Sequence, residues 1–341
     1  MTLDSQQKKN FPPVSIIILT YNGSNYIKPL LDSLLNQSYR QDRMEILVVD
    51  NASSDDTLSI IRENHPSVKT VALEKNIGFA AGNNQALLHA SHDLLVFLNQ
   101  DTICHPGFLQ AMVAMMEADN TLAACNPNII TPDVPGFGEL SGEFTPESLY
   151  LCDLAPWGYG KNRIINGQKV FRPKLLSGCA FIIRRETVKR LGYLFDDRLW
   201  MYAEDTDLSL RLHNLDQKIG VIRHAVVHHS HHSNLRLGGN RLHTAAGAIR
   251  NRVYVYYKNM TGLEFLLFAP FLFLGGIFKI LEFPLSATRK AIYFLPFGVF
   301  SLACMIAALA QLPRFAGQKR HSLKQRRIPD LALLKLILKC N

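Results

Sequence analysis

Leu94-Leu95-Val96-Phe97-Leu98 is an uninterrupted apolar run that ends at the polar residues Asn99-Gln100-Asp101. A run of this length without alternation is typical of a strand buried on both faces of a parallel sheet. Asp101 then lies just past the carboxyl end of that strand, the edge where open α/β sheets bind ligands. A carboxylate there can hold a divalent cation against a diphosphate, because hard cations take oxygen ligands. The alternative is an Asp that caps the following turn.

Other strands and helices alternate with this run in the first hundred residues. The predicted elements are strands over 14–19, 45–50 and 69–74 and helices over 25–37, 55–63 and 80–91. Ser53 or Ser54 offers an N-cap to the second of these helices. Alternation at this spacing predicts βαβ units and a parallel α/β sheet. The strands that end at Asp50 and Asp101 bring two acidic residues to the same edge, which favours a nucleotide site.

Composition and missing motifs exclude several classes of protein. The chain has 341 residues, 48% of them apolar and 19% charged, which is typical of a globular protein with one large domain or a domain and an appendage. No G-x-G-x-x-G follows the first strand and no P-loop motif is present, so the dinucleotide-binding and P-loop classes lose their main support. Six cysteines without a C-x-x-C pair indicate reduced thiols. Residues 1–10 lack the apolar core of a signal peptide, so we expect the chain in the cytoplasm.

A series of short motifs extends over roughly residues 14–258. They are Ser15-Ile16-Ile17-Ile18-Leu19-Thr20-Tyr21-Asn22, Val48-Val49-Asp50-Asn51-Ala52-Ser53-Ser54-Asp55, Asn76-Ile77-Gly78-Phe79-Ala80-Ala81-Gly82-Asn83-Asn84, Phe97-Leu98-Asn99-Gln100-Asp101-Thr102, Ser177-Gly178-Cys179-Ala180-Phe181, Ala203-Glu204-Asp205-Thr206-Asp207-Leu208 and Arg250-Asn251-Arg252. In sequence and order these motifs resemble the family 2 glycosyltransferases with the GT-A fold, and in particular their rhamnosyltransferase-like branch. The resemblance implies transfer of a sugar from a nucleotide donor.

By this resemblance, Asp50 hydrogen-bonds the pyrimidine base of the donor, and Thr20, Tyr21 and Asn22 line the same pocket. The alternative for Asp50 is an Asx turn with Ser53.

The resemblance also assigns Asn76, Gly78 and Gly82 to the nucleotide site, where glycine lets the backbone approach a ligand closely. The same stretch could equally be a plain loop before a helix. Asp101 matches the last position of the family's D-x-D metal motif, and Asn99, also assigned to the nucleotide site, replaces the first. One carboxylate fewer predicts weaker binding of Mg²⁺ or Mn²⁺.

An acidic pair, Glu204-Asp205, precedes a predicted amphipathic helix. By resemblance Asp205 is the general base and Glu204 orients the acceptor, while Asp207 pairs with Arg211 at i,i+4. The alternative is that acids at a helix N-terminus only favour the helix dipole. The resemblance and the bulky neighbours of the acidic pair assign the sugar and acceptor pocket to Trp200, Tyr202 and Gly178.

Four histidines lie in the cluster His228-His229-Ser230-His231-His232. His228 is the favoured metal or diphosphate ligand, because the preceding strand is predicted over 220–227 and ends beside it. The alternative is an exposed polar loop.

The C-terminal segment differs from the rest of the chain in charge and in apolar content. Residues 261–341 contain 11 Lys or Arg and 3 Asp or Glu, a net charge of +8 out of a total of +9. Residues 265–278 and 291–312 are apolar runs, the second long enough to span a bilayer. A buried core helix is the alternative for either run. Basic residues after an apolar run favour a phospholipid surface over nucleic acid as partner.

These observations predict a GT-A domain over residues 12–258, with a nucleotide-binding half at 12–105 and an acceptor half at 106–258, and a membrane-associated tail at 259–341. The expected function is inverting, non-processive, Mg²⁺- or Mn²⁺-dependent transfer to a lipid-linked glycan at the cytoplasmic face of the cell membrane. The expected donor is dTDP-rhamnose, with a UDP-sugar as the alternative. From another class, the chain could be an inactive nucleotide-sugar-binding scaffold. A processive synthase is disfavoured because no Q-x-x-R-W follows Asp205.

Overall fold

The computed structural model describes residues 11–130, 148–154, 160–166, 173–230, 241–278 and 287–339. By the contacts within the chain it divides into two compact units. Unit 1 comprises residues 1–152, 162–200 and 218–237, and unit 2 comprises residues 153–161, 201–217 and 238–341.

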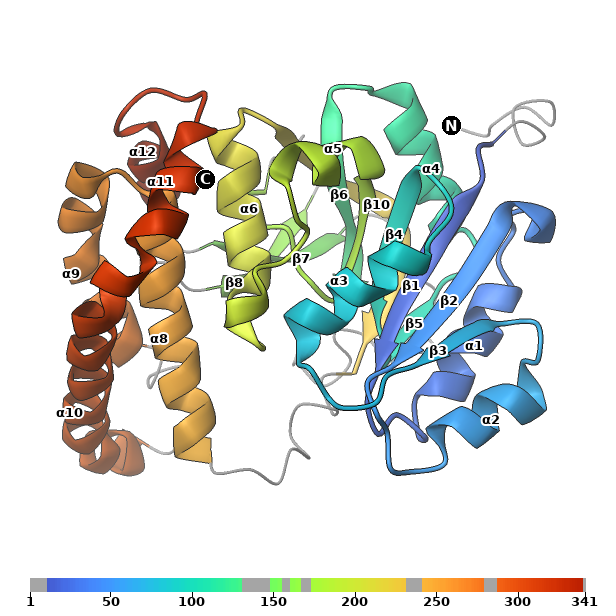
Figure 1. The fold of residues 1–341 in the computed structure, drawn as a ribbon, viewed down its shortest axis with the longest axis horizontal. Coiled ribbons are helices and arrows are strands. Elements are labelled where there is room, and N and C mark those ends of the chain that lie inside the picture. The colour runs from blue at the N-terminus through green and yellow to red at the C-terminus, as the bar shows by residue number, and fades with distance from the viewer. Residues whose placement is uncertain are drawn as a thin grey trace. The chain divides into compact units, whose positions relative to one another are not determined.

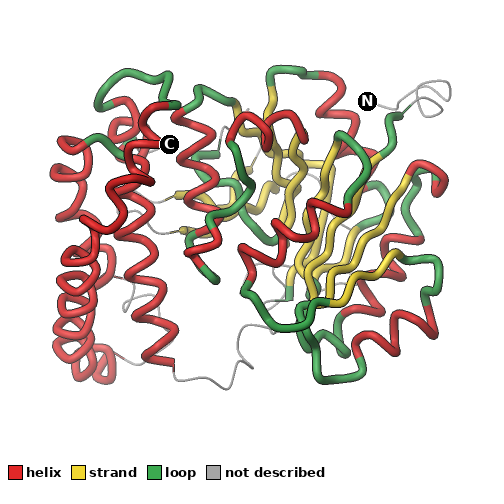
Figure 2. Tube along the Cα trace, viewed as in Figure 1, coloured by secondary structure: helices red, strands yellow, loops and turns green. Residues whose placement is uncertain are grey.

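Unit 1 is built on one mixed sheet, and its elements are visible in Figures 1 and 2. Its strands are β1 (Val14–Thr20), β2 (Met44–Asp50), β3 (Lys69–Ala72), β4 (Leu94–Asn99), β5 (Thr102–Cys104), β6 (Leu122–Ile130), β9 (Ala180–Arg184) and β10 (Lys218–His229). Among the described residues the order in the sheet is β3-β2-β1-β4-β9-β6-β10-β5. β1, β2, β3 and β4 run parallel, β10 is parallel to β6, and β9 and β5 run antiparallel to their neighbours. The predicted mostly parallel α/β sheet is therefore confirmed.

Both faces of the central strands are buried, which explains their continuous apolar runs. Ile16 and Ile18 of β1 belong to the core cluster that includes the apolar residues of α1 (Ile27–Leu35) and α4 (Phe108–Ala118). The alternate residues point to the other face. There α3 (Phe79–His89) packs on β1 and β2, and the rings of Phe97 and Phe181 stack with centroids 4.9 Å apart.

The remaining elements of the chain are shorter strands and helices. They are η2 (Gln41–Arg43), α2 (Thr57–Asn64), β7 (Ser148–Leu154) and β8 (Gly160–Asn166), which form a separate two-stranded sheet, α5 (Arg185–Leu191), η3 (Asp197–Leu199), α6 (Glu204–Asn214), α8 (Arg241–Asn259), α9 (Gly262–Phe278), α10 (Ala287–Gln311), η5 (Leu312–Phe315), α11 (Ala316–Lys324) and α12 (Ala332–Leu338). The predicted helices and strands of the first hundred residues are present with ends shifted by at most two residues. The expected serine cap of α2 is wrong, because the N-cap is Asp56 and its side chain makes no capping hydrogen bond.

Unit 2 is helical and holds a buried polar network. Asp207 accepts hydrogen bonds from Arg211 Nε at 2.9 Å and from Asn259 Nδ2 at 2.8 Å, and Lys258 Nζ lies 2.7 Å from Asp207 Oδ1. The predicted Asp207–Arg211 pair is therefore confirmed. Ser322 of α11 donates to Asn259 Oδ1 at 2.9 Å.

A second buried contact holds the start of α9. Glu264 forms a reciprocal capping box with Thr261, in which each accepts from the other's backbone N–H at 2.9 and 3.2 Å. Its carboxylate also accepts two hydrogen bonds from Arg326, at 2.7 and 2.8 Å. The domain boundary expected after residue 258 thus falls inside unit 2, because helices on both sides of it share buried polar contacts.

Candidate active site

The carboxyl ends of β1, β2 and β4 bring the first predicted site residues together. In the register of the sheet Thr20 lies beside Asp50, and Leu19 lies beside Asn99. The strand order also reverses here, since β2 and β3 lie on one side of β1 and β4 lies on the other. Ligands of open α/β sheets bind at such a switch point.

Gln100 fastens two of these strand ends to each other. Its Oε1 accepts hydrogen bonds from Thr20 Oγ1 at 2.7 Å and from Tyr21 N at 2.9 Å, and its Nε2 donates to Tyr21 O at 3.2 Å. The sequence analysis did not predict this role. Gln100 occupies the middle of the motif Asn99-Gln100-Asp101, but a glutamine whose side chain only faces solvent would have the same sequence neighbours.

Asp50 forms the Asx turn that the sequence offered as an alternative. Its carboxylate accepts hydrogen bonds from Ser53 N, at 3.0 Å, and from Ser53 Oγ. Asn22, with φ of 48°, accepts from Ser54 N at 2.9 Å and so joins the loops after β1 and β2. Recognition of a base by Asp50 stays a prediction.

Asn51 holds the loop before α3 in place. Its Nδ2 donates to Asn76 Oδ1 at 3.0 Å and to Gly78 O at 3.2 Å, and its Oδ1 accepts from Ile77 N at 2.9 Å. Asn76 Oδ1 also accepts from Gly78 N at 2.9 Å. The Asn76 side chain therefore shapes its own loop, and any contact with a nucleotide stays a prediction.

The two glycines of this motif have packing roles. Gly78 has φ of 86°, and a Cβ on it would come within 2.8 Å of the indole and the carbonyl of Trp200. That carbonyl accepts from Phe79 N at 2.6 Å, at the start of α3. A Cβ on Gly82 would lie 2.7 Å from the Leu19 side chain. The missing side chain of Gly82 therefore lets α3 pack closely on β1, and its contact with a nucleotide stays a prediction.

Asp101 is buried against a histidine at the sheet edge. His229 Nε2 lies 3.2 Å from Asp101 Oδ1 and 3.4 Å from Asn99 Nδ2. Burial lowers the pKa of His229, but the neighbouring Cys179 and Asp101 outweigh it and raise that pKa to about 10. His229 is therefore a cation at neutral pH and balances the Asp101 carboxylate.

The structure brings His229, and not the favoured His228, to Asp101. β10 continues to His229, and successive side chains of a strand point to opposite faces. When His229 faces Asp101, His228 faces away, where burial and the nearby His105 lower the pKa of His228. Residues 231–240, which hold the other two histidines of the cluster, lie outside the described residues.

Asp101 and His229 suit a divalent cation by their chemistry. A carboxylate oxygen and an imidazole nitrogen are ligands that Mn²⁺ accepts, and Mg²⁺ takes the carboxylate. Among the described residues no group of three or more His, Cys, Asp or Glu could hold a metal. Among the described residues, Asp101 and His229 would therefore share such an ion with diphosphate oxygens and water.

Gly178 lies in the turn that precedes β9. Asn126, which is buried, donates to Ser177 O at 3.0 Å and to Ala180 O at 2.7 Å, and accepts from Ser177 N at 2.9 Å. Cys179 O accepts from Asn99 N at 2.8 Å, so this turn borders the strand end that leads to Asp101. Its predicted contact with a sugar is untested.

In unit 2, Glu204 and Asp205 begin α6 after a strained segment of backbone. Tyr202 and Ala203 have φ values of 73° and 69°, a region that non-glycine residues adopt at a cost of about 1–3 kcal/mol each. Asn251 of α8 compensates by donating to Met201 O at 3.0 Å and to Tyr202 O at 3.1 Å. Such strain is concentrated at functional sites.

The two acids of this pair differ in their surroundings. Burial, followed by the charge of Asp205, raises the pKa of Glu204 to about 8. Glu204 Oε2 has no hydrogen-bond partner among the described residues. Asp205 is only half-buried and accepts from Thr206 N at 2.6 Å. Two adjacent carboxyl groups in such different environments are typical of acid–base sites.

The raised pKa of Glu204 makes a prediction about stability. The unfolded chain loses this proton near the ordinary carboxyl pKa, and the folded chain keeps it until about pH 8. The folded state therefore binds more protons between those values, and stability falls as pH rises through that window. We expect Glu204→Gln to raise the melting temperature at pH 9 and to change it little at pH 4. Glu186→Gln, at an exposed carboxylate, is the control, and an equal effect at both pH values would contradict the assignment.

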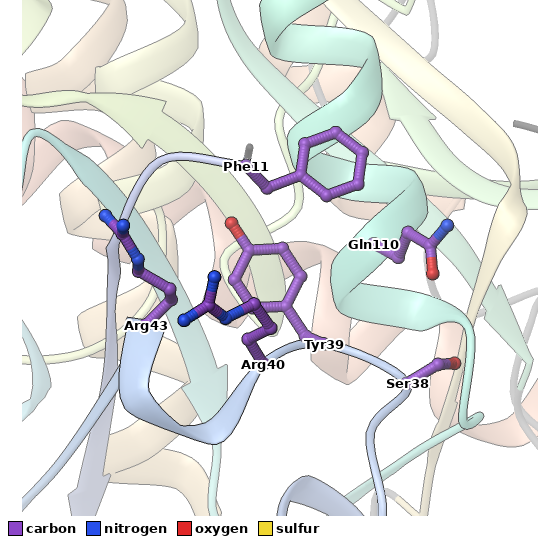
Figure 3. A pocket seen from close by; sticks show the side chains of 6 residues that line it. All are labelled: Phe11, Ser38, Tyr39, Arg40, Arg43 and Gln110. Atoms are coloured by element: carbon purple, nitrogen blue, oxygen red, sulfur yellow. The ribbon is translucent and has the colours of Figure 1, made fainter. Parts of the chain in front are cut away.

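A small pocket at the opposite edge of the sheet is a poor candidate for this site. It measures about 240 Å³ with open solvent included and is lined by Phe11, Ser38, Tyr39, Arg40, Arg43 and Gln110 (Figure 3). Phe11 precedes β1 and Arg43 precedes β2, so the pocket lies at the amino ends of the parallel strands. Asp50, Asn99 and Asp101 lie at their carboxyl ends.

Comparisons with known proteins agree with this geometry. A family model described as "Glycosyl transferase family 2" matches residues 15–192. The N-acetylglucosaminyl-diphospho-decaprenol L-rhamnosyltransferase of Mycobacterium tuberculosis is 24% identical over 246 residues, which cover 64% of this chain and 76% of that protein. The poly(ribitol-phosphate) β-N-acetylglucosaminyltransferase TarS of Staphylococcus aureus is 33% identical over 195 residues, 55% of this chain and 32% of TarS. Matches to the first few curated relatives thus span about a third or less of those proteins.

Solved structures of glycosyltransferases share the fold. TarS residues 1–349 with UDP superpose with a TM-score of 0.52 at 20% identity, covering 92% of this chain and 89% of that one. GalNAc-T7 with UDP, GalNAc and Mn²⁺ gives a TM-score of 0.61 at 16% identity, covering 85% of this chain and 55% of that one.

Proposed function

This chain belongs to glycosyl transferase family 2, and on that premise we propose that it transfers a sugar from a nucleotide donor to a lipid-linked glycan, with inversion at the anomeric carbon. The observation that carries the proposal is the side-chain set that unit 1 gathers at one sheet edge, with Asp50, Asp101 and His229 beside the ends of β1, β2 and β4. Transfer also requires a group that accepts the proton of the acceptor hydroxyl. The acidic pair Glu204-Asp205 at the start of α6 would supply it.

The reaction needs one displacement. The acceptor hydroxyl oxygen forms a bond to the anomeric carbon, the bond from that carbon to the diphosphate oxygen breaks, and the hydroxyl proton passes to the Asp205 carboxylate. The nucleoside diphosphate leaves with the electron pair of the broken bond. Asp205 suits this role because it is the more exposed of the two acids and its neighbour Glu204 retains its proton to about pH 8. Glu204 would orient the acceptor as a hydrogen-bond donor.

Asp101 and His229 would hold Mg²⁺ or Mn²⁺. When bound, such an ion offsets the charge that develops on the leaving diphosphate. His229 must be neutral to coordinate a metal, so the proton it shares with Asp101 would have to leave.

The donor we favour is dTDP-rhamnose. Support comes from Asn99 at the first position of the metal motif, as in the rhamnosyltransferase-like branch, and from the similarity to the mycobacterial rhamnosyltransferase. UDP-GlcNAc is the alternative, in view of the similarity to TarS. A panel of nucleotide sugars tests both, with donor-dependent binding and slow hydrolysis as the readouts. If the chain were an inactive scaffold, it would bind one of these nucleotide sugars and hydrolyse none of them. The presence of Asp101, Glu204 and Asp205 argues against that alternative.

We further place the enzyme at the cytoplasmic face of the cell membrane. The +8 charge of residues 261–341 and their apolar runs support this location. A lipid-linked acceptor would be reached there. Recovery of full-length protein in the supernatant after membranes are pelleted would contradict it.

The metal assignment predicts a conditional loss of affinity in Asp101→Ala. With Mn²⁺ present, the dissociation constant for the nucleoside diphosphate should rise at least about tenfold, which is 1.4 kcal/mol. In EDTA the variant and the unchanged protein should bind equally, because the carboxylate acts through the metal. Titration calorimetry measures both, with Asp119→Ala as a surface control. An equal loss in EDTA would assign Asp101 to the structure of the loop.

A further inference from the structure

α9 exposes an apolar face to solvent. Its exposed large apolar side chains recur every three or four residues along the helix and so share one side of it. They are Leu263, Leu266, Leu267, Phe271 and Leu274. The opposite side of α9 packs into unit 2 through Glu264, Phe268 and Leu272, all of them buried. α9 is apolar on all sides. One face is buried in unit 2, and the exposed face needs a second apolar environment.

α10, which packs against α9, repeats this arrangement over its described side chains. Its exposed large apolar side chains are Val299, Leu302, Ile306 and Leu309, and its buried positions are Ser301, Met305 and Ala308. The two helices together carry nine of the thirteen exposed large apolar residues among the described part of the chain. Scattered surface residues of this kind are ordinary, but a concentration on two adjoining helices marks an interaction surface.

Length and composition alone would permit a membrane span here. The stretch Val299–Lys324 is long and apolar enough to cross a bilayer. However, α8 packs along α10, and α8 carries Arg250, which is exposed, and Arg252, which is partly exposed (Figure 1). A helix that crosses the bilayer with such a neighbour would bring these charges to the hydrocarbon, where they are rare and expensive. The contacts within unit 2 therefore favour a helix that lies on the membrane.

Exposed cations follow the apolar face of α10 in the sequence. Arg314, Arg320, Lys324 and Arg327 are exposed in η5, α11 and the loop after it, and Asp330 is the one exposed acid among residues 312–330, all of which are described. An exposed apolar face that is followed in sequence by exposed cations suits the boundary of a bilayer with anionic headgroups, where the apolar groups enter the acyl region and the cations remain at the phosphates.

We propose that α9 and α10 lie in the plane of an anionic lipid leaflet, with their exposed apolar faces inserted into it. This deepens the membrane location proposed above by naming the surface and its orientation. The test of this proposal measures membrane binding alone. Membrane binding can therefore be refuted while sugar transfer is confirmed, and sugar transfer can be refuted while membrane binding is confirmed.

Flotation of the full-length chain with lipid vesicles tests the surface. The protein should float with phosphatidylcholine vesicles that contain phosphatidylglycerol, and less with phosphatidylcholine alone. Leu266→Asp with Ile306→Asp, at positions 70% and 58% exposed, should lower the bound fraction at least about tenfold. Leu88→Asp, at an exposed leucine of α3 in unit 1, is the matched control and should bind as the unchanged protein does. Loss of binding in the control, or retention in the double variant, would overturn the proposal.

Tryptophan depth measurements test the orientation. Val299 and Ile306 are seven residues apart, which is about 10 Å along a helix. Val299→Trp and Ile306→Trp should be quenched most by the same shallow lipid-borne quencher if α10 lies in the plane. Different depths would show a spanning helix and overturn the proposal. A lipid-free dimer in light scattering, with no vesicle binding, would assign the surface to a second copy instead.

Discussion

Asp205→Asn is expected to lower sugar transfer by about 10²–10⁴-fold while folding and donor binding remain close to those of the unchanged protein. Asparagine keeps the shape of the side chain and an oxygen that can accept the hydrogen bond from Thr206 N, so the start of α6 should persist. It removes only the proton acceptor. Steady-state transfer with the donor found in the nucleotide panel, together with calorimetry for the nucleoside diphosphate, measures the two effects separately.

A variant of Glu204 helps to interpret this result. If Glu204 acts as a protonated donor, Glu204→Gln should keep a larger share of the activity than Asp205→Asn, because the amide still donates a hydrogen bond. Transfer by Asp205→Asn within about tenfold of the unchanged protein would remove Asp205 from the mechanism. If Glu204→Gln instead keeps less activity than Asp205→Asn, Glu204 would be the general base and Asp205 would orient the acceptor.

Asp207→Asn is expected to destabilise unit 2 by about 3–5 kcal/mol, because it removes the buried carboxylate that both Arg211 and Lys258 contact. The side chains of Asp207 and Lys258 are 0% exposed and that of Arg211 is 4% exposed. Asparagine can still accept from Asn259 Nδ2 but cannot neutralise either cation. Chemical denaturation followed by far-ultraviolet circular dichroism measures the change.

The chain contains a matched control for this prediction. Glu186 and Arg190 form an i,i+4 pair of the same type, with side chains 68% and 52% exposed. Glu186→Gln should therefore change stability by at most about 1 kcal/mol. Lys258→Met combined with Asp207→Asn should recover part of the loss, since it removes one of the two buried cations that contact Asp207. Equal changes in stability for Asp207→Asn and Glu186→Gln would contradict the prediction, because they would show that the Asp207 network is no more shielded from solvent than the exposed pair.

The same network changes the expected behaviour of the C-terminal segment. From sequence, residues 259–341 are a separable tail behind a complete domain. In the structure Ser322 donates to buried Asn259, and Arg327 N donates to Asn214 O at 2.7 Å at the end of α6. Removal of the segment would leave polar groups of α6 and α8 without these partners, and such groups are costly when they stay buried. α9, α10 and the helix that begins with Glu204 and Asp205 therefore fold as parts of one unit.

Local patterns in the sequence were sufficient for the sheet and for its functional edge. Strand and helix periods are properties of neighbouring residues, so continuous apolar runs correctly predicted β1, β2 and β4. The polar residues that close these runs, among them Asp50 and Asp101, had to meet at one edge once the strands were parallel. The i,i+4 pair of Asp207 and Arg211 follows from helix geometry in the same way.

Partners distant in sequence were decided only by the tertiary structure. Which histidine faces Asp101 depends on where β10 ends and on its register with β5, and a shift of one residue exchanges His228 for His229. The close packing of Gly82 against Leu19 is likewise a long-range contact that the motif does not predict. Gln100, Asn126 and Asn251 hold site loops through hydrogen bonds of their side-chain amides, yet an amide residue has the same local sequence pattern in a core as on a surface. Sequence thus determined which chemical groups reach the sheet edge, and long-range packing determined which of them touch, because contact depends on distances that no local period records.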